Sequence, residues 1–421
     1  MDEPRAAQAG GACPFEPGDY GDVLSYFAEL RTAEPVAVQP SGTYAITKYD
    51  DLLVALNDTK TFSSLHELQE SRVQAAHVRS VIYHDDPEHL DLRRLINRAW
   101  TPRALLELLP AIEAQTSQLA DSIRDGEPVD MVPLGIELAA RVFAEIMGLP
   151  GQFERMRTWL SSGLVFVRPQ IAHTPWNDPA AISAEGLQAR FHEGYDDWNN
   201  YFLEIISIHK DHAPEQCKDV EKLTPFLRSL VAAVKADPEN LDRIYHQIMP
   251  PLLAGGVSTQ GHMYPSVVSG LLDRSTAWQM LKSDPSQLDF NGPSDVIEEL
   301  IRLKGVVQGL PRVTTADVEL RGVTIPAGSS VNLWYLSGNH DSDRFDDADE
   351  FRVRGISRHL SFGFGTHSCI GQSLVRLVIK CLLGQLVSRF SWLESVPGQD
   401  TNWGELGSYY TPSTLLIVAH V

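Results

Sequence analysis

The chain has 421 residues, of which 43% are hydrophobic and 21% are charged, and its mean hydropathy is -0.16; these values describe a soluble globular protein rather than a disordered or membrane one. No stretch comes near the roughly 18 uncharged apolar residues of a membrane span, and the N-terminus lacks an apolar signal-peptide segment, so we expect a cytoplasmic protein. A formal net charge of -20 disfavours nucleic acid and anionic membrane surfaces as partners.

The four cysteines, Cys13, Cys217, Cys369 and Cys381, are far apart and show no CxxC spacing. This pattern indicates neither a disulfide framework nor a zinc site, and we expect the thiols to stay reduced. Length alone suggests two or three domains of ordinary size.

The N-terminal part begins with residues 1–16, which we predict to be a disordered or loosely held leader. Residues 22–31 fit a short amphipathic helix. Residues 35–47 are typical of two strands joined by a Pro-Ser-Gly turn at 40–42, and a helix follows from Tyr49. The sequence therefore predicts a hairpin next to a helix.

Hydrophobic periodicity is weak over residues 65–83, and the next clear helix is predicted to start at Pro87. His89 and Arg93 lie at i and i+4 and so share one helical face, where on their own they could be a solvated pair. The stretch 103–150 carries helical patterns that end in a Gly-Leu-Pro stop signal.

Residues 161–181 are too rich in proline for regular structure and too aromatic, with Phe166 and Trp176, for an inert linker. We interpret His173 in this segment as a surface loop residue. Residues 188–236 are helical in pattern, with a polar break.

Residues 241–272 form a helical pattern that contains Pro250, Pro251 and Pro265 around a Gly255-Gly256 pair. Each proline removes a helical hydrogen bond and crowds the preceding turn, so we expect bends or breaks flanking the glycines.

A further helix starts at Asp295, with Glu299 and Arg302 on one face at i and i+3. An exposed ion pair of this spacing would contribute only ~0.5 kcal/mol and would indicate nothing special. Beyond it we predict a strand over 306–311, a strand, turn, strand and helix start over 321–341, and a turn over 409–413.

The stretch 360–376 places glycines ahead of Cys369 and an apolar helical run after it. Gly363 and Gly365 permit positive φ and the close approach of a bulky group. A thiol at a helix N-terminus is favoured as the thiolate, which is the form that binds metal. The alternative is an ordinary buried cysteine, which most lone cysteines are.

This stretch resembles, position by position, the haem-ligand loop of the cytochrome P450 family in the order Phe362, Gly363, Gly365, His367, Cys369, Gly371, Leu374 and Arg376. Only Val375 departs, where the family more often has alanine. The resemblance implies that Cys369 is the proximal ligand of haem iron, that His367 donates to a haem propionate and that Phe362 packs on the cysteine side of the ring.

The segment from Gly255 to Thr259 resembles the oxygen-binding kink of the family's central helix, which makes Thr259 the hydrogen-bond partner of the bound oxygen. In the family a carboxylate usually precedes this threonine and helps to deliver protons. Here Ser258 occupies that catalytic position, and a hydroxyl can relay a proton but cannot supply a carboxylate's charge. Either His262 or Gln260 organises a substitute water chain, or both face the helix surroundings without a catalytic role.

The resemblance also implies further contacts to haem, namely His89, Arg93 and Arg312 to the propionates and the glycines Gly255 and Gly371. Trp100 would pack nearby. Glu299 and Arg302 match the E-x-x-R motif that locks the core beneath the haem, with Arg354 as a third partner. The expected substrate contacts form an apolar, partly aromatic pocket of Phe166, Trp176, Val257, Leu310 and Tyr410.

Because the resemblance extends over nearly the whole chain, we expect a single domain over residues 17–421. Its fold would be mainly α with small β-sheets, an α+β arrangement of the cytochrome P450 type. The implied protein is a bacterial-type haem b (iron protoporphyrin IX) monooxygenase that uses O2 to hydroxylate or O-dealkylate a small apolar substrate.

Electrons would come from a ferredoxin served by an NAD(P)H-dependent ferredoxin reductase, since no reductase domain fits in this length. The expected landing patch for an acidic ferredoxin is basic: Arg94, Arg98, Arg103, Arg358 and Lys380. Two alternatives stay open, a peroxide-using or otherwise atypical haem-thiolate enzyme, suggested by Ser258, and a non-catalytic haem-binding sensor.

Overall fold

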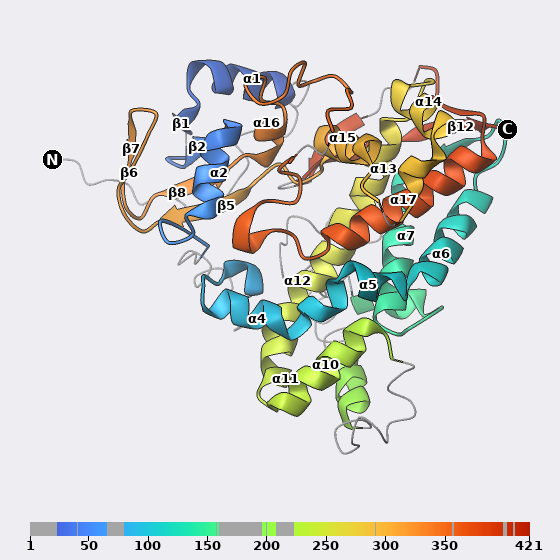
Figure 1. Cartoon of the computed structure of the whole chain (residues 1–421), viewed down its shortest axis with the longest axis horizontal. Coiled ribbons are helices and arrows are strands. Elements are labelled where there is room, and N and C mark those ends of the chain that lie inside the picture. Colours follow the sequence, from blue (N-terminus) through green and yellow to red (C-terminus); the bar gives the residue numbers. More distant parts are fainter. Residues whose placement is uncertain are drawn as a thin grey trace, which may run out of the picture.

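The computed structural model shows a helix-rich chain with short strands in small sheets, as predicted (Figure 1). It describes residues 23–39, 41–64, 80–156, 158–159, 196–198, 200–207, 223–290, 292–355, 358–398, 402–406 and 409–421. The predicted leader 1–16 and the segment 161–181, with the expected substrate contacts Phe166 and Trp176, lie outside these residues.

The α-helices of the described residues include α1 (Val23–Ala33), α2 (Tyr49–Asn57), α4 (Glu88–Ile96), α5 (Pro102–Leu106), α6 (Leu109–Asp121), α7 (Met131–Ile146), α10 (Pro225–Ala236), α11 (Asn240–Arg243), α12 (Met249–Leu253), α13 (Gln260–Ser269), α14 (Thr276–Ser283), α15 (Asp295–Lys304), α16 (Tyr335–Asn339) and α17 (Gln372–Arg389). Several begin at a side chain that caps the first turn. The hydroxyl of Ser294, for example, accepts from the backbone N–H of Ile297 and starts α15.

The strands are β1 (Val36–Val38), β2 (Tyr44–Ile46), β3 (Phe62–Ser63), β4 (Pro128–Asp130), β5 (Leu310–Thr314), β6 (Val318–Leu320), β7 (Val323–Ile325), β8 (Ser330–Leu333), β9 (Trp392–Ser395), β10 (Asn402–Leu406), β11 (Tyr409–Thr414) and β12 (Leu416–His420). The largest described sheet has the order β1-β2-β8-β5-β3, and β4-β12-β9, β10-β11 and β6-β7 form smaller ones. Most neighbours are antiparallel, whereas β2 and β8 are parallel.

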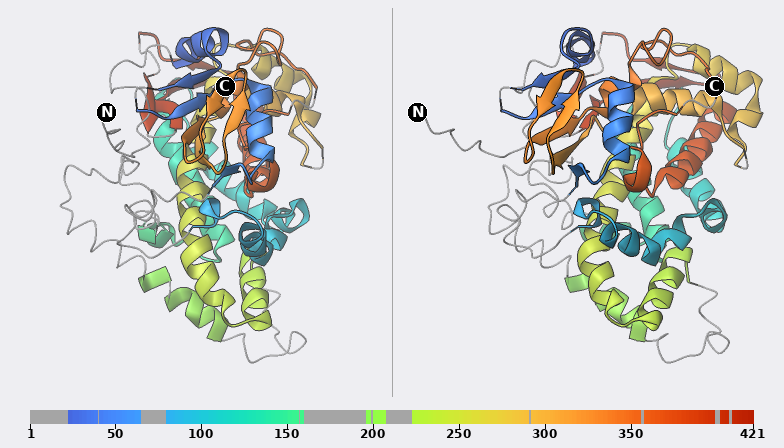
Figure 2. Two further views of the ribbon diagram at one scale, coloured as in Figure 1. Left: turned by 90° about the vertical axis from the view of Figure 1, so that its left-hand side faces the viewer. Right: turned by 60° about the vertical axis from the view of Figure 1, so that its left-hand side comes forward.

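The sheet β1-β2-β8-β5-β3 lies with α1, α2 and α16 at one end of the molecule, and the remaining helices fill the rest (Figure 1). Helices α11, α12 and α13 follow one another in a long helical column that passes through the molecule in all three views (Figure 2). Two π-helical turns, Ile244–Ile248 and Ala254–Thr259, interrupt this column. They flank Pro250 and Pro251 and satisfy the prediction of local distortion around the glycines.

Helix α7 packs almost backbone to backbone against α13. A Cβ atom added at Gly135 would lie 2.6 Å from the carbonyl oxygen of Gly261, and one added at Gly261 would lie 2.7 Å from the Cα of Ile136. Only glycine fits at such a distance, so these two residues fix the central helix against its neighbour. Pro265 continues α13 without a break, next to Gly135.

The predicted hairpin at 36–46 and the helix from Tyr49 are confirmed. The predicted turn over 409–413 is wrong, because these residues form strand β11, which pairs with β10. The strand predicted over 306–311 begins later, at Leu310, although Val307 forms an isolated bridge to Tyr409.

Candidate functional site

The loop before α17 turns on two glycines with positive φ, +66° at Gly363 and +71° at Gly365. A Cβ added at Gly365 would lie 2.8 Å from the carbonyl oxygen of Leu56, so a larger residue would push the loop off α2. The backbone N–H of Cys369 donates to the carbonyl oxygen of Phe362 at 2.8 Å and closes the loop. The thiol is therefore held on a rigid backbone.

The Cys369 sulfur lies at the N-terminus of α17, where the backbone N–H groups of Gly371 and Gln372 hydrogen-bond to it. Burial raises the pKa of the thiol, and these donors and the charges of Arg93 and Arg376 oppose that rise without overcoming it. The side chain is nevertheless exposed, so the sulfur lies deep in the protein but faces open space rather than packed atoms. A metal cation at this position would favour the thiolate.

Four basic side chains gather beside the loop: His89, Arg93, Arg312 and His367. His89 and Arg312 are buried, and burial together with the charges of His89, Arg312 and Arg93 lowers the pKa of His367 to about 3. A buried guanidinium needs an anionic partner, and among the described residues Asp86 lies beside the cluster, with its Oδ1 3.3 Å from Nδ1 of His89. The cluster has the donors for two carboxylates.

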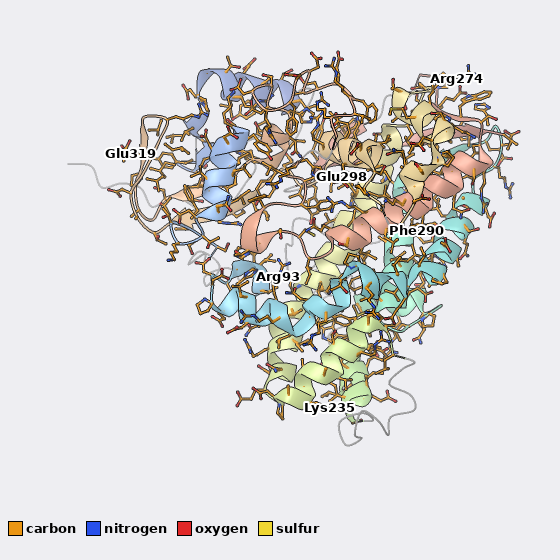
Figure 3. All side chains as sticks on the ribbon, in the orientation of Figure 1. Arg93, Lys235, Arg274, Phe290, Glu298 and Glu319 are labelled. Atoms are coloured by element: carbon orange, nitrogen blue, oxygen red, sulfur yellow. The ribbon has the colours of Figure 1, made fainter. Side chains whose placement is uncertain are left out.

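Arg93 also holds the cysteine loop itself. Its Nη1 donates to the carbonyl oxygens of Thr366, at 3.1 Å, and Ser368, at 2.5 Å. Figure 3 shows Arg93 and Glu298 on opposite sides of the start of α17 in this view. The prediction that His89 and Arg93 act from one face of a helix agrees with their place in α4.

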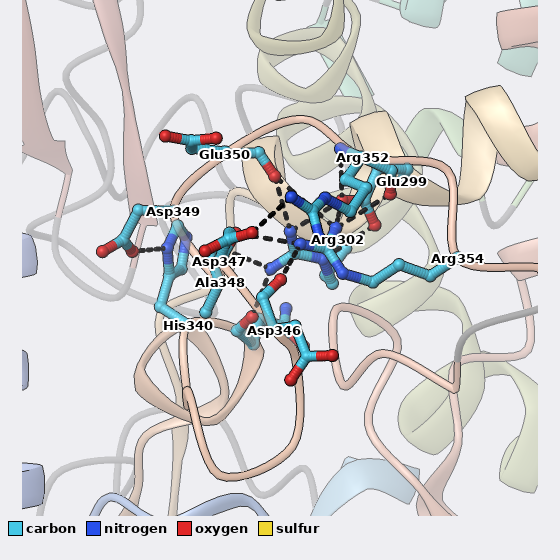
Figure 4. Close-up of polar contacts among 11 residues, drawn as sticks. Glu299, Arg302, His340, Asp346, Asp347, Ala348, Asp349, Glu350, Arg352 and Arg354 are labelled. Carbon is cyan, nitrogen blue, oxygen red and sulfur yellow. Dashed lines mark hydrogen bonds and ion pairs between the residues drawn. The ribbon is translucent and has the colours of Figure 1, made fainter.

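The E-x-x-R pair is fully buried, so it is not the weak surface pair that spacing alone would allow. Arg302 donates to both oxygens of Glu299, at 2.7 and 2.8 Å, and to the carbonyl oxygens of Asn339 and Ala348 (Figure 4). Arg354 forms a second ion pair with Glu299, which confirms it as the third partner.

Glu298 is a residue of this network that the sequence analysis missed. Its carboxylate receives two hydrogen bonds from Arg376, at 2.6 and 2.7 Å, and lies 3.1 Å from Nε2 of His359. Although burial alone would raise the pKa of Glu298, these partners lower it to about 2. The Arg376 guanidinium lies 4.6 Å from the centroid of the Phe362 ring, so the network links α15 to the cysteine loop.

The π-helical turn Ala254–Thr259 places adjacent residues in different surroundings. A Cβ added at Gly255 would meet no atom of the described residues within 4 Å, whereas one added at Gly256 would overlap the ring of Phe143. Val257 is buried in the core, and Ser258 is buried with a hydroxyl that has no hydrogen-bond partner among the described residues.

His262 and Gln260 both form hydrogen bonds within their own helix. Nδ1 of His262 lies 2.7 Å from the carbonyl oxygen of Ser258, and burial lowers the pKa of this imidazole. Oε1 of Gln260 accepts from the Tyr264 hydroxyl at 2.7 Å. Of the two interpretations left open, these contacts favour the one in which both residues face the helix surroundings.

The hydroxyl of Thr259 lies 3.1 Å from the hydroxyl of Tyr409, a contact that the sequence analysis also missed. The predicted substrate contact Tyr410 points the other way and stacks on Trp403, with the ring centroids 5.1 Å apart. Alternation of side chains along a strand would have separated the two tyrosines, had 409–413 been recognised as a strand.

The remaining predicted residues fall in different places. Leu310 is half-buried in β5, and Trp100 lies in the core in a 3₁₀ turn that packs against α10. Lys380 is wrong as a surface charge, because it is buried and its ammonium group donates to the carbonyl oxygens of Asp289 and Gly292. Arg94 is exposed and pairs with Asp91.

The described residues contain no group of three or more His, Cys, Asp or Glu side chains that could hold a metal ion. In the same part of the chain, no helix is long and apolar enough to cross a membrane.

Comparison with known proteins extends over nearly the whole chain. The family model described as Cytochrome P450 matches residues 294–414. The cytochrome P450 109 of Bacillus spizizenii is 29% identical over 371 residues, which cover 87% of this chain and 84% of that protein. The erythromycin C-12 hydroxylase of Saccharopolyspora erythraea is 30% identical over 398 residues, 88% of each chain. The solved structure of a cytochrome P450 from Chondromyces apiculatus has a TM-score of 0.77 at 26% identity and covers 95% of this chain and 96% of that one.

Proposed function

This chain belongs to the cytochrome P450 family of monooxygenases, and from that premise we propose that its site holds haem b with Cys369 as the ligand to iron. The observation that carries the proposal is the exposed Cys369 sulfur deep in the protein, at a helix N-terminus and next to four basic side chains. A thiolate ligand next to donors for two carboxylates fits an iron porphyrin that bears two propionates.

Bound through a thiolate, haem supplies the activation of O2, because the sulfur donates electron density to iron and favours cleavage of the O–O bond. The protein residues hold and tune the group. The N–H groups of Gly371 and Gln372 draw charge from the sulfur, and Arg376 keeps the Phe362 ring against the loop. Gly255 leaves room for a flat ring beside the central helix.

The propionates would be bound by His89, Arg93, Arg312 and His367. Arg93 and Arg312 supply positive charge, and His89 and His367 can each donate through a ring N–H. On the other side of the ring, the hydroxyl of Thr259 would donate toward the reacting oxygen, with Ser258 as its neighbour.

We infer an apolar substrate, because the described residues that were predicted to line the pocket, Val257, Leu310 and Tyr410, carry no charged group. The relative named for C-12 hydroxylation of erythromycin supports hydroxylation ahead of O-dealkylation as the reaction. Electrons would come from a ferredoxin and an NAD(P)H-dependent ferredoxin reductase, with the exposed Arg94, Arg98, Arg103 and Arg358 as the landing patch.

The haem-thiolate assignment is tested by the absorption spectrum of the reduced carbonyl complex. The protein supplied with haem should show the red-shifted band of thiolate coordination, and Cys369→Ala should lose it. Cys381→Ala is the matched control, since Cys381 is a buried cysteine in α17, the helix that follows Cys369, and it should keep the band. A protein that stays colourless, or a band that survives Cys369→Ala, would exclude the assignment.

A non-catalytic haem-binding sensor is the second candidate, and a different measurement separates it. The holoprotein is incubated with a surrogate ferredoxin, its reductase and NADH, and a panel of apolar compounds is screened for oxygenated product. Product formation identifies a monooxygenase, whereas binding without product across all compounds that change the haem spin state favours the sensor.

A further inference from the structure

The hydroxyl groups of Thr259 and Tyr409 lie 3.1 Å apart, although 150 positions separate the two residues in the chain. Thr259 ends the π-helical turn of the central helix, and Tyr409 begins strand β11. The contact joins Thr259, the predicted hydrogen-bond partner of the bound oxygen, to strand β11, to which no catalytic role was assigned.

The backbone of β11 holds Tyr409 in place. The carbonyl oxygen of Tyr409 accepts from Nε2 of Gln308 at 3.3 Å, and Tyr409 forms a bridge with Val307. The backbone N–H of the next residue, Tyr410, donates to the carbonyl oxygen of Val306 at 2.8 Å. Because the strand is fixed to the segment 306–308, the phenol is presented to Thr259 from a rigid support.

In the structure, Ser258 cannot orient the hydroxyl of its neighbour Thr259. Its side chain is only 4% exposed, and its hydroxyl has no hydrogen-bond partner among the described residues. It therefore neither supplies a charge nor orients Thr259, and the hydrogen bond recorded for the Thr259 hydroxyl goes to a phenol instead.

We propose that Tyr409 is the positioning residue for Thr259, donating a hydrogen bond to Oγ1 so that the threonine's own proton points toward the reacting oxygen. The inference rests on the proposed function of Thr259. A threonine hydroxyl carries one proton, and it can donate forward only if its neighbour does not receive that proton. A phenol is a better donor than an aliphatic alcohol, so the Tyr409 hydroxyl is the expected donor of the pair.

The nearby imidazole of His262 carries no charge that would perturb the Tyr409 hydroxyl. The His262 ring centroid lies 6.5 Å from that of Tyr409, and burial lowers the pKa of His262, so it is neutral. Its Nδ1 must carry the proton, because the carbonyl oxygen of Ser258 can only accept. In the hydrogen bond between Thr259 and Tyr409, the direction that we propose runs from the phenol hydroxyl to Oγ1 of the threonine.

The test uses carbon monoxide as a probe and needs no substrate. Infrared spectroscopy of the reduced carbonyl complex measures a C–O stretching frequency that responds to a neighbouring hydrogen-bond donor. Thr259→Val removes the donor, and Tyr409→Phe removes only the phenol hydroxyl. The control is Tyr264→Phe, which also removes a phenol hydroxyl. Tyr264 lies in α13, directly after Thr259, but its hydroxyl donates to Gln260 and not to Thr259.

We expect Thr259→Val and Tyr409→Phe to shift the C–O band in the same direction, the double variant to equal Thr259→Val, and Tyr264→Phe to leave the band in place. A shift from Thr259→Val alone overturns the role of Tyr409 and leaves the proposed function standing. A shift from Tyr409→Phe alone means that the phenol acts directly, which also overturns the positioning role. If both variants are silent while the thiolate spectrum is normal, Thr259 itself has no role, and the inference falls with it.

Discussion

The imidazole rings of His89 and His367 are stacked, with their centroids 3.8 Å apart and their planes inclined by 26°. One ring comes from helix α4 and the other from the cysteine loop. Burial is the main reason that both pKa values are lowered, so at neutral pH the stack is an uncharged pair between two arginines. Two charged rings could not stack in this way without strong repulsion.

The pair makes the stability of the haem-free protein depend on pH. Folded His367 resists protonation down to its pKa of about 3, whereas the unfolded residue binds a proton near pH 6.5. Between these values the unfolded state binds more protons, so the free energy of unfolding falls as the pH falls, by up to about 1.4 kcal/mol per pH unit. Urea unfolding at a series of pH values should show that the free energy of unfolding changes less steeply with pH in His367→Gln than in the wild type.

Comparison above pH 6.5 serves as the internal control for this prediction. There the wild type and His367→Gln should differ by a constant amount that reflects lost contacts only. Parallel stability curves over the whole acid range would contradict the lowered pKa.

The buried Glu299–Arg302 pair should matter far more for stability than an exposed pair of the same spacing. Arg302→Met leaves a buried carboxylate with fewer partners and should lower the free energy of unfolding by roughly 3–5 kcal/mol. Arg94→Met breaks the exposed i,i+3 pair with Asp91 and should cost at most about 1 kcal/mol. Equal losses in urea unfolding would show that burial does not set the difference.

These two pairs also show why the sequence could predict the motif but not its energy. Asp91–Arg94 and Glu299–Arg302 have the same spacing, and only tertiary packing decides which is buried. The same limit explains Lys380, whose charge suggested a surface residue although two backbone carbonyls receive its ammonium group. Local signals sufficed where the structure is local, as in the hairpin at 36–46 and the Cys369 loop.

Contacts between distant segments were the part that the sequence did not reveal. The Thr259–Tyr409 hydrogen bond requires β11 to lie beside the central helix, and no periodicity within either segment encodes that. Arg376 and Glu298 likewise meet only after α15 and α17 pack together.

Gly255 and Gly256 form a matched pair for testing the central helix. Gly256→Ala would push a methyl group into Phe143 and should lower the free energy of unfolding by roughly 1–3 kcal/mol. Gly255→Ala meets no atom and should leave the haem-free protein as stable or up to about 1 kcal/mol more stable. Haem affinity should respond in the opposite way: Gly255→Ala should reduce it, whereas Gly256→Ala should not. Equal affinity in both variants would mean that haem does not approach Gly255.

Charge reversal tests the landing patch for the ferredoxin. The combined change of Arg94, Arg98, Arg103 and Arg358 to Glu should slow reduction of the haem protein by about 10-fold or more at low salt and weaken the salt dependence. Arg274→Glu is the control, since Arg274 is exposed and lies far from Arg93 in Figure 3. Stopped-flow reduction by a surrogate ferredoxin measures both, and an unchanged, salt-insensitive rate would rule the patch out.

Substitutions of Ser258 test whether the site is impaired by the missing carboxylate or whether another group acts in its place. Because the serine hydroxyl is buried and has no hydrogen-bond partner in the part of the chain that the structure describes, Ser258→Ala should raise the free energy of unfolding by about 1 kcal/mol. Ser258→Asp would bury a carboxyl group where the serine hydroxyl finds no hydrogen-bond partner among the described residues, so the variant should lose roughly 3 kcal/mol of stability, and the pKa of the new carboxyl group should lie above its ordinary value.

A carboxyl group at position 258 that is uncharged, or that destabilises the fold, would not restore proton delivery at neutral pH. We therefore expect Ser258→Asp not to raise the fraction of NADH electrons recovered in product with a surrogate ferredoxin system, and Ser258→Ala to leave that fraction near the wild-type value. Both expectations follow from Thr259 having its partner in Tyr409 rather than in residue 258. An increase in coupling for Ser258→Asp, measured as product per NADH consumed, would show that the missing acid limits this enzyme and would favour a peroxide-using or otherwise atypical cycle for the natural chain.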